Sequence, residues 1–155
     1  MSKDKKEILI ELDKQKTRYI INSLRLLQVS SDDLYKNDSV IYKHKIKEKV
    51  YASDVYDFKK LQKFRSDLEY FLNSELFYRK IDFSEVIVII YALELYSRKL
   101  IENIILNDYK MGVSSDFLHN VNNLYDMLCN NVEIFYQNCD RYECQFILKS
   151  TYPTL

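Results

Sequence analysis

The longest run of apolar residues in the chain covers positions 86–93 and contains no polar side chain. Its β-branched residues favour a strand by propensity, but apolar residues continue at helical spacing to about residue 106, which is too long for a typical strand. Asp82, followed three residues later by Glu85, has the spacing of a helix-capping box. The pattern therefore predicts a helix over about 84–106. Because this helix begins apolar on every side, other elements must surround it.

Apolar residues also recur at helical spacing elsewhere, with polar residues on the opposite face. The clearest of these segments ends at Leu72 and begins at a capping residue, Ser53 or Asp54. The remaining segments are shorter or less regular. Together they predict helices over residues 5–28, 53–72, 75–81, 115–138 and 140–150.

Residues 39–51 fit two kinds of secondary structure. Ile46 and Val50 have the i, i+4 spacing of one helix face. The lysines at every second position from 43 to 49 instead fit a strand with one exposed face. We prefer the interpretation of a short helix.

Glycine and proline are almost absent, since Gly112 and Pro153 are the only residues of either type. Sheet proteins use both residues in tight turns, so their scarcity favours long helices. The chain has 155 residues and no internal repeat, which is the size of one domain. We therefore expect a single all-α domain over residues 1–155, a bundle of six to seven helices around the buried helix at 84–106.

Cysteine usage and hydropathy indicate where the protein is located. The longest apolar run is far shorter than the roughly 20 residues that cross a bilayer. The three cysteines are an odd number, and no charged-then-apolar leader opens the sequence, which favours a reducing compartment. These features predict a soluble cytoplasmic protein without a membrane span.

No set of residues in the sequence has the spacing of an active site. A single glycine excludes the dinucleotide-binding fingerprint and the phosphate-binding loop, because each needs at least two. His44 lies among lysines, which would lower its pKa, and is expected at the surface, while His119 is expected at the surface or near a helix cap. Cys129, Cys139 and Cys144 lack the close pairing typical of zinc ligands. We therefore expect no enzyme activity, no metal and no cofactor.

Charge is unevenly distributed along the chain. Residues 1–65 contain 16 Lys and Arg against 10 Asp and Glu, and residues 66–155 contain 7 against 13. A basic face interleaved with tyrosines would bind nucleic acid through phosphates and stacking, which is an alternative function. The residues of this expected basic face are Lys43, Lys45, Lys47, Lys49, Lys59, Lys60, Lys63 and Arg65.

The order of helices resembles that of the Bcl-2-like helical bundle, in particular its small poxviral members. The resemblance covers Phe83–Leu100, the loop at Gly112, and the helix from Phe117 to Tyr136. In that family a buried hydrophobic helix follows a capped turn and packs beside an amphipathic helix. The resemblance implies a viral Bcl-2-like protein in the host cytosol, without catalytic activity, that modulates host apoptotic or innate immune signalling through protein–protein contacts.

The first turn of the expected buried helix differs from that of cellular members of the family. Those members have Trp-Gly-Arg there, and the arginine binds an aspartate of a death-promoting partner helix. The matching residues here are Phe83, Ser84 and Glu85, and an acid would repel that aspartate. The resemblance therefore favours the tail-less poxviral branch. Candidate residues for a partner-binding groove are Phe58, Leu61, Phe64, Phe71, Glu85 and Val86.

Self-association is the other alternative function. A structural protein that binds its own copies would form a homodimer through an exposed apolar patch.

Overall fold

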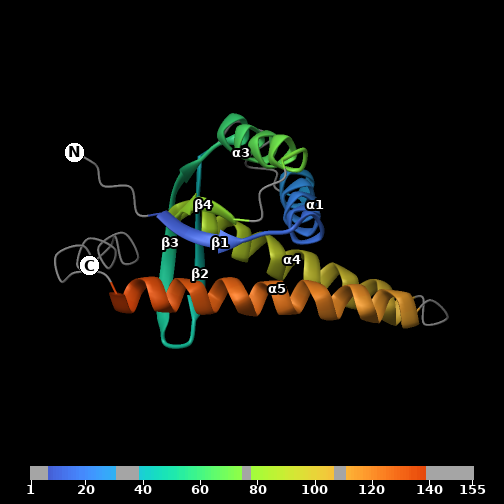
Figure 1. The fold of residues 1–155 in the computed structure, drawn as a ribbon. Helices are drawn as coiled ribbons and strands as arrows, with labels where there is room; N and C mark the ends of the chain where they lie inside the picture. Colours follow the sequence, from blue (N-terminus) through green and yellow to red (C-terminus); the bar gives the residue numbers. More distant parts are fainter. Residues whose placement is uncertain (1–6, 31–38, 75–77, 107–110, 139–155) are drawn as a thin grey trace.

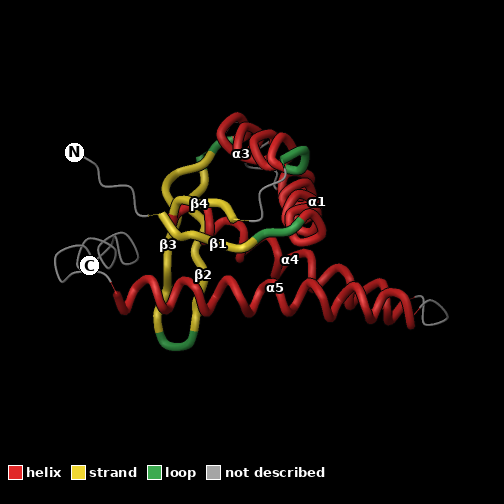
Figure 2. The backbone as a smooth tube through the Cα atoms, viewed as in Figure 1, coloured by secondary structure: helices red, strands yellow, loops and turns green. Residues whose placement is uncertain are grey.

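The computed structural model describes residues 7–30, 39–74, 78–106 and 111–138 (Figures 1 and 2). These residues form four helices and two antiparallel sheets of two strands each. The expected all-α bundle of six to seven helices, and with it the Bcl-2-like fold, is therefore wrong, because the fold is mixed α/β. In chain order the elements are β1 (Glu7–Glu11), α1 (Lys14–Ser30), β2 (Val40–Ile46), β3 (Lys49–Tyr56), α3 (Phe58–Phe71), β4 (Tyr78–Asp82), α4 (Phe83–Leu106) and α5 (Met111–Asn138).

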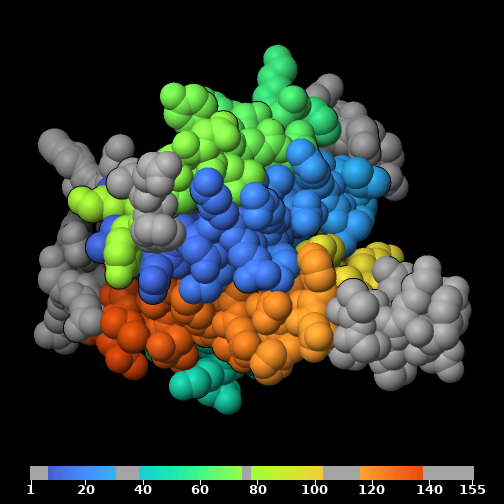
Figure 3. All heavy atoms as spheres, turned by 45° about the vertical axis from the view of Figure 1, so that its right-hand side comes forward, coloured from blue at the N-terminus to red at the C-terminus, as the bar shows by residue number. Residues whose placement is uncertain are grey.

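Helix α4 lies at the centre of the molecule and begins within one residue of the predicted start. It packs against α1, α5, β4 and both strands of the β2–β3 hairpin, so helices cover part of its surface and strands cover the rest. In Figure 3 only a small part of α4 reaches the surface on the face shown. Among the side chains of residues 83–102, those with no exposure are Val86, Ile87, Val88, Ile89, Ile90, Ala92 and Leu93.

The N-terminal part of the predicted 5–28 helix is strand β1, which pairs with β4. The register places Glu7 opposite Asp82 and Glu11 opposite Tyr78. Exposed and buried residues alternate along β1, which is the period of a strand. Helix α1 starts only after Asp13, whose carboxylate accepts a hydrogen bond from the Lys16 amide at 2.8 Å.

The β2–β3 hairpin replaces the short helix preferred for residues 39–51. Tyr42, His44 and Ile46 are buried on its inner face, while the alternating lysines are exposed. The lysine spacing is therefore that of a strand with one exposed face, and the short helix is wrong. The hairpin closes through a two-residue turn in which Lys47 has a positive φ of 56°. In Figure 3 the tip of the hairpin projects beyond α5.

Helices α3 and α5 follow the amphipathic patterns predicted for them, with shifted ends. Helix α3 begins at Phe58, since the Asp57 carboxylate accepts from the Lys60 amide at 2.8 Å and caps it, so the expected start at Ser53 or Asp54 is wrong. Residues 78–81 belong to β4 and not to a helix. The helix expected over 140–150 lies outside the described residues.

One hydrophobic core connects all of these elements, and it includes residues from each helix and each strand. The β1–β4 sheet and the hairpin each contribute one face to it, and their other faces point outward. Among the described helices, none has a stretch long and apolar enough to cross a membrane.

Candidate functional site

A polar cluster under the hairpin brings together side chains that are far apart in the sequence. His44 comes from β2, Glu94 from α4, and Tyr125 and Cys129 from α5. The Nε2 atom of His44 and the hydroxyl of Tyr125 form a hydrogen bond of 2.6 Å. The Nδ1 atom of His44 lies 3.7 Å from a carboxylate oxygen of Glu94. The cluster thus aligns a carboxylate, an imidazole and a hydroxyl, an order that is also found in nucleophilic active sites.

Burial favours the protonated forms of the two groups in the cluster that could act as nucleophiles. Burial raises the pKa of the Tyr125 hydroxyl, and it raises that of the Cys129 thiol to about 11. An activated nucleophile needs a lowered pKa or a base that receives its proton easily. Burial also lowers the pKa of His44, an effect that the Glu94 carboxylate opposes. The cluster connects β2 to α5 through the hydrogen bond with Tyr125 and to α4 through the contact with Glu94.

The expected surface position of His44 is wrong, because only 7% of its side chain is exposed. Its pKa is lowered, as predicted, but burial is the main cause and not the neighbouring lysines. Successive side chains of a strand point to opposite faces. If residues 42–46 form a strand, the lysines face the solvent, so the residues between them point inward, namely Tyr42, His44 and Ile46. His119 is exposed on α5, as predicted.

Most residues of the predicted groove are part of the hydrophobic core. The side chains of Leu61, Phe64, Phe71 and Val86 are buried, and Phe58 is partly buried against the same core. These five residues do not form an exposed apolar surface that a partner helix could contact.

Glu85, the remaining groove residue, takes part in the cap of α4. Its carboxylate accepts a hydrogen bond from the Asp82 amide at 3.4 Å, and the Asp82 carboxylate accepts from the Ser84 amide at 3.2 Å. The Ser84 hydroxyl accepts from the Asp54 amide at 2.6 Å and so ties β3 to the start of α4. Burial raises the pKa of both Asp82 and Glu85. The cap predicted from the sequence spacing is confirmed.

The residues of the expected basic face fall into two groups. The lysines of the hairpin lie in the half next to its turn, because Lys43 pairs with Ala52 and Lys49 with Ile46. The basic residues of α3 follow Tyr56, which lies at the opposite end of the hairpin. The tyrosines interleaved with these basic residues in the sequence are buried, namely Tyr42, Tyr51 and Tyr56.

Several of these basic residues have partners within the molecule. Lys47 forms an ion pair with Glu133 at 3.2 Å, and the Lys49 ammonium lies 4.9 Å from the ring centre of Tyr136. On α3, Lys63 forms an ion pair with Asp67. The Lys60 ammonium donates a hydrogen bond to the Val55 carbonyl and lies over the ring of Tyr56. Lys59 is exposed on the same helix.

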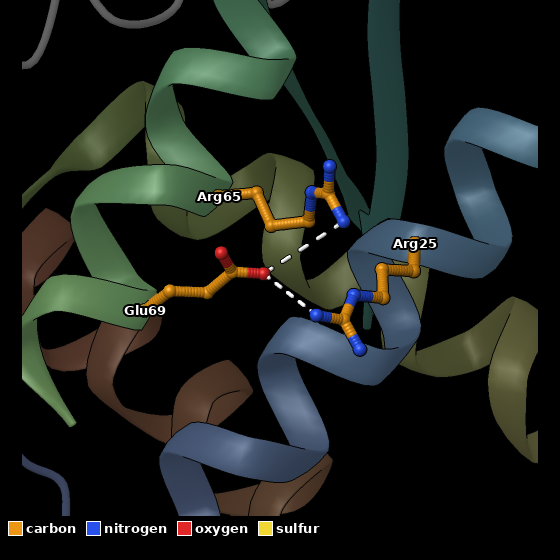
Figure 4. A network of polar contacts seen from close by, with 3 residues as sticks. All are labelled: Arg25, Arg65 and Glu69. Atoms are coloured by element: carbon orange, nitrogen blue, oxygen red, sulfur yellow. Dashed lines mark hydrogen bonds and ion pairs between the residues drawn. The ribbon is translucent and has the colours of Figure 1, made fainter.

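Arg65 shares the carboxylate of Glu69, its neighbour on α3, with Arg25 of α1 (Figure 4). The same Glu69 oxygen lies 2.9 Å from a guanidinium nitrogen of Arg25 and 3.7 Å from one of Arg65. These groups are partly exposed, so each pair contributes about 0–1 kcal/mol. Arg65 therefore has an ion pair on its own helix and is not a free basic group, while Arg25 links the same carboxylate to α1.

The outer surface of the hairpin carries a different combination of side chains. Ile41 and Val55 are direct cross-strand partners, with 44% and 48% of their surfaces exposed. Lys43 and Lys45 follow on the same face of β2, and neither has an ion pair with any residue that the structure describes. We call these four residues the hairpin face. The alternating pattern of β2 is the sequence signal for it.

Comparison of the chain with known protein families, with curated proteins and with solved structures found no match. In residues 7–30, 39–74, 78–106 and 111–138, no group of three or more His, Cys, Asp or Glu residues is arranged to hold a metal ion.

Proposed function

We propose that the protein acts by binding another protein through its hairpin face and not by catalysis. The observation that carries this proposal is the exposed pair Ile41 and Val55 beside Lys43 and Lys45, which have no internal counter-charge among the described residues. Apolar side chains surrounded by charged ones are typical of the surfaces that bind proteins. The lysines would select a partner with an acidic surface.

The arrangement supports a protein partner better than a nucleic acid. Binding of single strands depends on exposed aromatic side chains for stacking, and Tyr42, Tyr51 and Tyr56 are buried. Binding of a duplex depends on many free basic groups along one surface. Here the basic residues occupy opposite ends of the hairpin, and several have internal partners.

The biological role of the protein is a separate part of the proposal. The resemblance of residues 83–136 to poxviral proteins implies modulation of host apoptotic or innate immune signalling in the cytosol. That role stays a prediction that depends on the resemblance, whose all-α fold the structure contradicts.

The proposal is tested by reversing charge on the hairpin face. Three proteins are immobilised in parallel: the wild-type chain, the variant K43E/K45E and the control K59E/K63E. Each is then incubated with a lysate of the cells in which the chain is expressed. The control makes the same charge change on the exposed surface of α3. We expect proteins that the wild type and K59E/K63E retain equally and that K43E/K45E loses.

Two results would contradict the proposal. One is that all three chains retain the same proteins in the same amounts. The other is that the wild type binds a DNA or RNA oligonucleotide with an affinity that falls steeply with salt, since that dependence is typical of phosphate binding. Circular dichroism of each variant shows whether the fold is kept.

A further inference from the structure

The β1–β4 sheet presents a second outward face whose charge is opposite to that of the hairpin face. Glu7, Leu9 and Glu11 alternate with the buried residues of β1 and are exposed. The register places Tyr78 opposite Glu11 on this face. Leu9 and Tyr78 have 60% and 58% of their surfaces exposed. We call these four residues the acidic face.

The negative charge of the acidic face is not balanced within the molecule. Glu7 is the cross-strand partner of Asp82, and like charges in this position repel each other. The exposed positions of the two strands include one basic residue, Lys80, which lies opposite Leu9. Neither Glu7 nor Glu11 has an ion pair with a described residue. The face therefore leaves unpaired carboxylates beside two exposed apolar side chains.

The two faces match each other in three respects. Each is the outer surface of a two-stranded antiparallel sheet, and each has two large apolar side chains about half exposed. Each also has two like charges without an ion pair to a described residue, Lys43 and Lys45 on one face and Glu7 and Glu11 on the other, with Lys80 as one basic residue beside the glutamates. Contact between such faces would pair the charges and bury the four apolar side chains together.

We propose that the partner of the hairpin face is a second copy of this chain, which binds through its acidic face. The proposal rests on the proposed function and names the partner. The contact is heterologous, because it joins unlike surfaces of the two copies. Repeated from copy to copy, a heterologous contact gives a closed ring or an open chain of copies.

The test measures molar mass by light scattering and sedimentation over a range of concentrations of the full chain. For the wild type we expect a mass above that of the monomer, with association that weakens as salt is added. The variants K43E/K45E and E7K/E11K should each associate at least about tenfold more weakly, since like charges would face each other across the contact. The control K59E/K63E should behave as the wild type.

Charge swapping makes the test specific to this pair of faces. In the variant K43E/K45E/E7K/E11K all four signs are reversed, so opposite charges again face each other and association should return to the wild-type level. An equimolar mixture of the two double variants should also associate. In that mixture each hairpin face meets an acidic face of opposite sign.

A wild-type chain that stays monomeric at every concentration would overturn the inference. So would double variants that associate as strongly as the wild type, or a swapped variant that stays as weak as its parents. If the wild type is monomeric while K43E/K45E still loses captured proteins, only the inference of a second copy fails. If hairpin-face variants change neither measurement, the proposed function fails as well.

Discussion

A buried histidine with a lowered pKa makes the stability of the fold depend on pH. His44 is in contact with groups from two helices, Glu94 on α4 and Tyr125 on α5. The other ionisable groups of this region are Cys129, Asp126 and Glu133 on α5, which lie next to Tyr125 or Cys129. Burial favours the neutral imidazole, so protonation of His44 works against the native packing of β2.

We predict that protonation of His44 lowers the free energy of unfolding in acid. The pKa of His44 is lower in the folded chain than its ordinary value of 6.5, so its contribution is fully present above pH 6.5. It is lost as the pH falls through the folded-state pKa, by at most about 1.4 kcal/mol per pH unit. Urea denaturation of the wild type and His44→Gln between pH 7.5 and about pH 5 measures the difference.

The matched control for this prediction is His119→Gln, which replaces the exposed histidine of α5. The raised pKa values of Asp82 and Glu85 give a dependence of the opposite sign, but they are common to all three chains. The free energy of unfolding of His44→Gln should therefore fall less in acid than that of the other two. Parallel curves for the three proteins would show that His44 does not titrate as described.

The sequence contains enough information to orient individual side chains but not to place their partners. The alternation around His44 indicates its inward direction once β2 is taken as a strand. Glu94 and Tyr125 lie 50 and 81 positions away along the chain. Nothing in the spacing of those residues predicts that they meet. The candidate cluster therefore could not be predicted from the sequence, because the spacing of its residues does not indicate that they are close in the fold.

At the scale of elements, the scarcity of glycine led to the wrong fold class. Tight hairpin turns favour glycine or asparagine because these residues accept a positive φ at little cost. The β2–β3 turn instead uses Lys47 with φ 56°, so the hairpin leaves no glycine signal in the sequence. Strands β1 and β4 are only five residues each, and their pairing joins segments about 70 positions apart. Helices α3, α4 and α5, with 14, 24 and 28 residues, carry a stronger periodic signal, and the sequence predicts them.

We predict that the backbone of this turn is strained. Both Lys47→Ala and Lys47→Gly lose the ion pair with Glu133. The two variants therefore differ only in the methyl side chain of alanine. An L-residue in the left-handed region costs roughly 1–2 kcal/mol, which glycine avoids. Lys47→Gly should therefore be about 1 kcal/mol more stable than Lys47→Ala in urea denaturation. Equal stabilities, or a more stable alanine variant, would contradict the assigned conformation of the turn.

At the scale of the whole molecule, the central helix determines how the other elements are arranged. The apolar run at 86–93 requires a cover on every side, and this part of the prediction agrees with the burial of α4. The run does not indicate what the cover is made of, since strands and helices bury apolar side chains equally well. Here α1 and α5 cover one part of α4 and the two small sheets cover another.

This arrangement predicts a steep difference in mutational cost along one helix. Ile87 has no exposed surface near the start of α4, where the strands and helices meet, whereas Ile101 is 42% exposed toward its end. Ile87→Ala should lower the free energy of unfolding by roughly 2–5 kcal/mol, because it leaves a cavity among several packed elements. Ile101→Ala should change it by less than about 0.5 kcal/mol. Both values are measured by urea denaturation monitored by circular dichroism.

If Ile87→Ala does not fold, Ile87→Val should still be destabilised by about 0.5–1.5 kcal/mol. Equal costs at the two positions would mean that the start of α4 is no more enclosed than its end.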